Sequence, residues 1–276
     1  MDIAGIIFAS VMVVFWVFVL FCMPARARAK RRRELLESHF PQEWERILQK
    51  NVPFAHKLPE SLKKQFHGII QVLMAEKRFV GCGGLDITDE IRVTILGQAA
   101  ILLLNQPDTH YFKKLKTIYV YPHTYEASTR SFDGVMEIEG KSVRLGESWQ
   151  NGPIVLAWDS VTGGARNMKD GRNVVFHEFA HQLDQEDGVA DGAPILESRS
   201  CYRSWARVLG EEYENLHKKM GRRRKTVIRY YGGTNPAEFF AVATEAFFEK
   251  PKQMNRRCPD LYEEMKHYYK VDPLEW

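Results

Sequence analysis

Two imidazoles and a carboxylate stand close together in the pentapeptide His177-Glu178-Phe179-Ala180-His181. On a helix, residues four positions apart lie on the same face, so both histidines can direct their rings at one metal ion. Glu178 is then displaced around the helix toward a water molecule on that ion, where a carboxylate can act as general base. The spacing therefore predicts a zinc site suited to metal-assisted hydrolysis.

The same pentapeptide also has an ordinary structural interpretation. With nine histidines in 276 residues, the pattern His-Glu-x-x-His arises by chance in roughly one such chain in fifty. The histidines would then only hydrogen-bond their neighbours in a partly buried amphipathic helix. Apolar residues around the motif, and glycines upstream at 163, 164 and 171, favour a packed helix that follows a loop, with Asp170 or a nearby turn residue as its cap.

A catalytic zinc ion takes three protein ligands and keeps one position for water. The segment 230–249, YYGGTNPAEFFAVATEAFFE, contains the best candidate for the third ligand. Asn235 is typical of an N-cap and Pro236 of a first helical residue, so Glu238 falls in the opening turn of a helix. A glutamate at that position can also bond back to the cap or favour the helix dipole, and its position leaves both roles open.

Further acidic residues could support the ligands. Glu245 lies two turns from Glu238 on roughly the same face of the expected helix, which suits a hydrogen bond to a ligating histidine. Both Glu245 and Glu249 are also alternatives to Glu238 as ligand. Asp184, three residues beyond His181, could orient an imidazole or could belong to a solvated acidic helix end.

Five blocks of sequence resemble the Mlc titration factor A family of zinc-dependent peptidases, also called the DgsA anti-repressor family. They are CGGLDITDEIRVTILGQAAILLL, IYVYP, GPIVLAWDSV, DGRNVVFHEFAHQLD and NPAEFFAVATEAFF, and the match covers most of residues 35–270. The resemblance implies one Zn²⁺ per chain in an α+β, zincin-like metallopeptidase domain. Such a domain would have a small sheet, an active-site helix and a helical lobe.

A narrower likeness is to the catalytic domain of anthrax lethal factor. That domain has a similar HEF-x-H helix and a YG-x-TN-x-AEFFA segment that resembles residues 231–241 here. This resemblance implies Glu238 as third ligand and Tyr231 as the phenol that steadies the oxyanion or protonates the leaving group. Lethal factor has a second acidic residue one turn beyond its ligand; this chain has Val242 there, and Glu245 is the expected substitute.

The family resemblance implies two functions of different classes. One is peptide hydrolysis, with aminopeptidase-like activity on small substrates; the other is binding of an Mlc-type transcriptional repressor. An inactive scaffold is a third interpretation, but the presence of Glu178 argues against it, because a binding module needs no proton acceptor there.

Residues 3–23 form an uncharged run that could cross a membrane. As a helix, its 21 residues would span roughly 31 Å. Six basic residues follow between 26 and 33, whereas only Asp2 precedes the run, and this asymmetry keeps the next domain in the cytoplasm. A cleaved signal peptide would have its positive charges before the run. We expect a single-pass inner-membrane anchor at 1–24, a basic juxtamembrane segment at 25–34 and a cytoplasmic zinc metallopeptidase domain at 35–276.

The rest of the chain is nearly neutral. Without the basic flank and Asp2, 33 basic and 34 acidic residues remain, which removes the main argument for direct nucleic-acid binding. The basic cluster at 222–225 could contact an acidic partner, but a solvated surface is the favoured interpretation. The four cysteines are widely separated, as suits a reducing cytoplasm.

Helices and a small sheet are expected before the metal motif. Helical patterning covers residues 34–50, 58–79 and 87–105. Strand character covers residues 115–121, 135–139 and 154–159. Thr88 is a possible cap of the third helix. The strand at 154–159 is expected at the sheet edge, where an extended peptide could pair with it.

Overall fold

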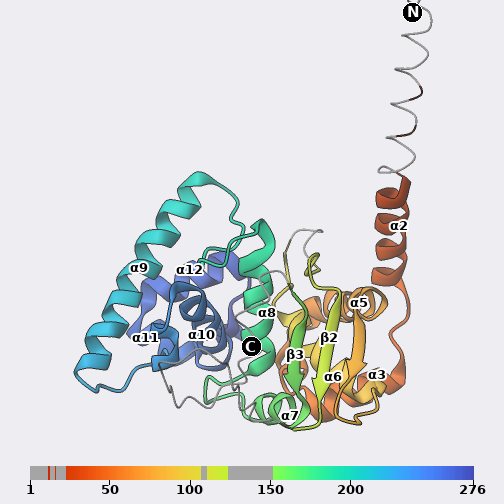
Figure 1. Ribbon diagram of the computed structural model, residues 1–276, viewed down its shortest axis with the longest axis horizontal. Coiled ribbons are helices and arrows are strands. Elements are labelled where there is room, and N and C mark those ends of the chain that lie inside the picture. The colour runs from red at the N-terminus through yellow and green to blue at the C-terminus, as the bar shows by residue number, and fades with distance from the viewer. Residues whose placement is uncertain (1–11, 13–15, 17–22, 107–110, 124–151) are drawn as a thin grey trace, which may run out of the picture.

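The computed structural model describes residues 12, 16, 23–106, 111–123 and 152–276 (Figure 1). Nearly all of the predicted anchor, and the whole predicted strand at 135–139, lie outside these residues. Among the helices that are described, none has both the length and the apolar character needed to cross a membrane. The basic segment is helical and belongs to α2 (Met23–Glu37).

The first part of the domain is mostly helical. After α2 come α3 (Gln42–Asn51), α4 (Phe54–Lys57), α5 (Glu60–Glu76) and α6 (Asp89–Ile101). The prediction of one helix over 34–50 is wrong, because Pro41 adopts an extended conformation directly before α3 and a proline disfavours helix in the residue before it. Thr88 caps α6 by accepting a hydrogen bond from the backbone N–H of Ile91, as predicted.

Three parallel strands form a small sheet in the order β1-β2-β3. Their bounds are β1 (Arg78–Gly81), β2 (Thr117–Tyr121) and β3 (Ile154–Ala157). The sequence predicted β2 and β3, but it assigned the first residues of β1 to a helix. That assignment is wrong because Arg78 to Gly81 pair with β2 in register. Among the described strands β3 lies at an edge, as expected, and it leads directly into α7 (Trp158–Arg166).

The helix that carries the pentapeptide, α8 (Val174–Asp184), lies between two parts of the fold (Figure 1). On one side of α8 are the sheet and the N-terminal helices α2 to α6. On the other side are the C-terminal helices α9 (Arg199–Gly221), α10 (Pro236–Glu249), α11 (Pro251–Arg257) and α12 (Pro259–Tyr269). The short turns η2 (Gln185–Asp187) and η3 (Tyr230–Gly233) follow α8 and precede α10, and η4 (Pro273–Glu275) lies near the C-terminus. The predicted α+β class with a small sheet is thus confirmed.

Aromatic packing fixes the orientation of α8. Phe176 is fully buried and contacts Phe54 and Phe248, whose ring centroids lie 5.4 and 5.2 Å from that of Phe176. Phe179 packs edge-on against Phe112 at 4.7 Å. Burial of each such ring contributes roughly 1.5–3 kcal/mol. Because these contacts define the buried faces of α8, they also determine where its histidines point.

Candidate metal centre

The start of α8 is set by a side-chain cap. Asn173 accepts a hydrogen bond from the backbone N–H of Phe176 at 3.0 Å, which satisfies one of the free donors of the first turn. Of the two caps considered above, the nearby turn residue is therefore correct and Asp170 is not. Asp170 instead accepts the backbone N–H of Arg172 at 2.9 Å, within the turn that leads to the helix.

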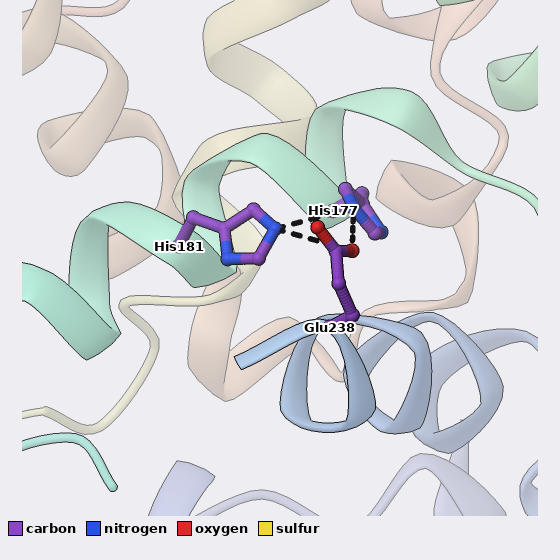
Figure 2. Close-up of side chains that lie close together, drawn as sticks. All are labelled: His177, His181 and Glu238. Atoms are coloured by element: carbon purple, nitrogen blue, oxygen red, sulfur yellow. Dashed lines mark hydrogen bonds and ion pairs between the residues drawn. The ribbon is translucent and has the colours of Figure 1, made fainter. Parts of the chain in front are cut away.

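The start of α10 directs Glu238 toward α8. Asn235 caps this helix by accepting the backbone N–H of Glu238 at 2.9 Å, and Pro236 is its first residue, both as predicted. The side chain of Glu238 does not bond back to the cap. Figure 2 shows its carboxylate between the rings of His177 and His181.

Three potential ligand atoms converge at this point. His177 Nε2 lies 3.0 Å from Glu238 Oε2 and 3.2 Å from His181 Nε2, and His181 Nε2 lies 3.5 Å from Glu238 Oε2. Donors at about 2.0–2.1 Å from one zinc ion, arranged tetrahedrally, would be separated by roughly 3.3 Å. The observed separations fit three ligands of such an ion.

The electrostatics of the cluster agree with this geometry. Burial lowers the pKa of His177, but hydrogen bonds with Glu238 and Glu245 outweigh it and raise that pKa to about 10. Burial raises the pKa of Glu238, yet hydrogen bonds with His177 and His181 hold it well below its usual value. The cluster therefore favours a positive charge between these side chains, which is the charge a divalent cation supplies.

Glu245 contacts the first histidine from behind, as predicted. His177 Nδ1 donates to Glu245 Oε1 at 2.9 Å, and the Glu245 side chain is only 2% exposed. In the neutral ring that a metal ion requires, this hydrogen bond keeps the proton on Nδ1 and leaves the lone pair on Nε2, the atom that faces His181 and Glu238. Glu245 therefore orients His177, and it is Glu238 that joins the cluster of ligand atoms.

The two predicted catalytic residues lie beside the cluster. Tyr231, in η3, has its ring centroid 5.8 Å from that of His177, and 43% of the residue is exposed. Glu178 is partly buried on α8, and its charge contributes to the raised pKa of His177. The ring of Tyr231 is thus close to His177 and partly exposed, and Glu178 is close enough for its charge to act on His177.

Asp184 does not belong to a solvated helix end. It is fully buried at the C-terminal end of α8, and burial raises its pKa to about 6. The charge of His181 opposes that shift, and neither carboxylate oxygen has a hydrogen-bond partner among the residues that the structure describes. The solvated helix end is therefore wrong for Asp184, and its role in orienting an imidazole stays a prediction, because it contributes only its charge at His181.

Sequence reasoning missed Arg229. Its guanidinium forms an ion pair with Glu245 and donates to the backbone carbonyl of Gly171 at 2.9 Å. In the sequence, nothing distinguishes Arg229 from the nearby basic cluster at 222–225. In the structure they differ in burial. The cluster at 222–225 is exposed to solvent, as expected, whereas the Arg229 side chain is only 26% exposed.

Comparisons with known proteins agree with the geometry. Residues 26–270 match the family described as "Glucose-regulated metallo-peptidase M90". An uncharacterized protein of Synechocystis sp. is 38% identical over 246 residues, which cover 88% of this chain and 89% of the relative. Proteins named Mlc titration factor A from Yersinia pestis and Yersinia pseudotuberculosis are 28% identical over 238 residues, or 84% of this chain and 85% of each relative.

The resemblance inferred from the sequence blocks is therefore confirmed. The family match spans almost the whole described domain, including α8 and α10 with their candidate ligands. This chain belongs to the M90 metallopeptidase family, the family of Mlc titration factor A.

Proposed function

We propose that this protein is a zinc-dependent peptidase of zincin-like architecture, with one Zn²⁺ per chain held by His177, His181 and Glu238. The observation that carries this proposal is the convergence of three ligand atoms from two helices, at separations that suit a tetrahedral ion. Membership of a metallopeptidase family supports the reaction class.

The roles of the protein groups follow from their positions. When bound, zinc would polarise the scissile carbonyl and increase the acidity of a water molecule. Glu178 takes a proton from the attacking water and passes it to the amine as the peptide bond breaks. Tyr231 donates its hydroxyl hydrogen to the oxygen that becomes negatively charged. Glu245 keeps His177 in the tautomer that a ligand requires.

Small peptides are the substrate class that we propose, with aminopeptidase-like cleavage. The exposure of Tyr231 supports an open site, and β3 at the edge of the described sheet supports backbone pairing with an extended substrate. The membrane anchor at 1–24, with the catalytic domain facing the cytoplasm, is also a proposal. It is supported by the basic residues exposed on α2.

Binding of an Mlc-type repressor is the second candidate function. The name of the Yersinia relatives favours it, since these proteins are described as titrating Mlc. Such a contact would depend on surface residues that the metal centre does not identify, so the two functions are compatible.

The test uses the full chain purified in detergent. Zinc content is measured by elemental analysis, and a peptide library is incubated with the wild type, Glu178→Gln and the control Glu211→Gln, which changes an exposed glutamate of α9. We expect one zinc per chain in all three proteins and loss of cleavage only in Glu178→Gln. Zinc binding without cleavage by the wild type would favour repressor binding, and absence of zinc would overturn the proposed site.

A further inference from the structure

Arg229 connects three segments that meet behind the candidate metal centre. It precedes Tyr230, the first residue of η3, and so is two positions from Tyr231. Its Nε donates to the carbonyl of Gly171 at 2.9 Å, in the turn before α8. Its Nη2 donates to Glu245 on α10. One side chain thus joins the approach to α8, the middle of α10 and the turn that carries Tyr231.

Glu245 depends on this contact for charge compensation. Its Oε1 accepts from His177 and Arg229, and its Oε2 accepts the backbone N–H of Asn173 at 2.6 Å. A carboxylate that is only 2% exposed is costly unless donors and positive charge surround it. Arg229 carries a permanent charge, whereas His177 must be neutral to bind a metal. When zinc is bound, Arg229 is therefore the cation that stabilises Glu245.

We propose that Arg229 is a positioning residue of the metal centre. Through Glu245 it holds His177 with Nε2 toward the ion, and through Gly171 it fixes the start of α8 relative to η3 and Tyr231. The inference rests on the proposed zinc site and adds a residue that is not one of the three clustered ligands.

The chain offers a matched control in Arg32. It forms a bidentate ion pair with Glu76, at 2.7 and 2.8 Å, and its side chain is 16% exposed, against 26% for Arg229. That pair joins α2 to α5, whereas the Arg229 pair reaches His177. Loss of either arginine removes a partly buried ion pair, but only Arg229 is connected to a ligand.

The experiment measures zinc affinity of the full chain in detergent by competition with a chromophoric chelator. The variants are Arg229→Met, Arg229→Lys, Glu245→Gln, the double variant Arg229→Met/Glu245→Gln, and Arg32→Met. We expect zinc affinity about 10–100-fold weaker in Arg229→Met and a smaller loss in Arg229→Lys, which keeps the charge but not the planar fork. Arg32→Met should bind zinc like the wild type.

The double variant distinguishes positioning from general destabilisation. If Arg229 acts mainly through Glu245, the double variant loses clearly less zinc affinity than the sum of the losses in the two single variants. Fully additive losses, wild-type affinity in Arg229→Met, or an equal loss in Arg32→Met would each overturn the inference. Where Arg229→Met does not fold, Arg229→Lys and the double variant decide by the same criteria, with circular dichroism as the check of folding. If the wild type binds no zinc, the proposed function fails first and the inference fails with it.

Discussion

The contact between α8 and α10 contains two buried glutamates in opposite settings. At the metal-centre end, Glu245 receives hydrogen bonds from His177, Arg229 and the backbone of Asn173. One turn further along α10, Glu249 accepts the backbone N–H of Arg172 at 3.1 Å, and its Oε1 has no hydrogen-bond partner in the part of the chain that the structure describes. Residue type and helix are the same, so the difference lies in the donors that neighbouring segments supply.

This difference has an electrostatic consequence. Burial raises the pKa of Glu249 to about 8, and the charges of Asp170 and Glu245 add to the shift. When Glu249 is protonated, it contributes no negative charge near the metal centre. Glu245, with Arg229 beside it, stays ionised and stabilises a bound cation through His177. Burial alone therefore does not identify a functional glutamate. The comparison predicts that substitutions beside the ligands lower zinc affinity or kcat. A substitution of Glu249 should instead change the stability of the fold.

The largest expected effect is that of Glu178→Gln. Removing the general base should lower kcat by about 10²–10⁴-fold, because proton transfer contributes on that scale. Zinc content should remain that of the wild type, since Glu178 is not among the three clustered ligands. Steady-state kinetics on a cleaved peptide measures the first quantity and elemental analysis the second. Unchanged kcat would remove Glu178 from the proposed reaction.

Tyr231→Phe should have the next largest effect. Loss of one hydrogen bond to the developing oxyanion should lower kcat by about 10²–10³-fold with little change in KM. Because Tyr231 is 43% exposed, the melting temperature should hardly change. Tyr230→Phe is the matched control, since the Tyr230 hydroxyl donates to the carbonyl of Arg224. An equal loss of kcat in both variants would contradict a specific role for Tyr231.

Glu245→Gln tests the metal-centre end of the comparison. The amide accepts hydrogen bonds less strongly than the carboxylate, so zinc affinity should fall by about 10–100-fold. Chelator competition measures this loss. The variant Glu249→Gln, one turn away, should bind zinc like the wild type. An equal loss of zinc affinity in both variants would contradict the difference proposed between Glu245 and Glu249.

Glu249→Gln should change stability in a pH-dependent manner. The folded-state pKa of Glu249 is about 8, above its ordinary value of 4.5. The folded state therefore binds more protons, and the wild type loses stability as pH rises from about 4.5 to about 8. The uncharged amide avoids that loss. We expect Glu249→Gln to be about 1–3 kcal/mol more stable than the wild type at pH 9 and similar to it at pH 4.5. Urea unfolding at both pH values measures this, and a difference independent of pH would contradict the assignment.

Much of the candidate site was predictable because its signals are local. The i, i+4 spacing of His177 and His181 and the Asn235-Pro236 start of α10 depend on a few consecutive residues, and the structure contains both helices. The break at Pro41 was also readable from the residue type, although the predicted helix ran through it. Strand β1 was missed, because the helical pattern expected over 58–79 ran into its first residues.

The sequence by itself determined the residue types of the centre, their helical spacing and the family to which the chain belongs. The spacing alone left the third ligand open among the acidic residues of α10, and the resemblance implied Glu238. The tertiary structure decided it, because it brings Glu238 to both histidines and places Glu245 against His177. His177 and Glu245 are 68 residues apart, and Arg172 and Glu249 are 77 apart. Local interactions specify caps and helix faces, whereas the charge and hydrogen-bond partners of a buried carboxylate depend on the segments packed around it. Glu238, Glu245 and Glu249 therefore acquire different roles only when α10 packs against α8.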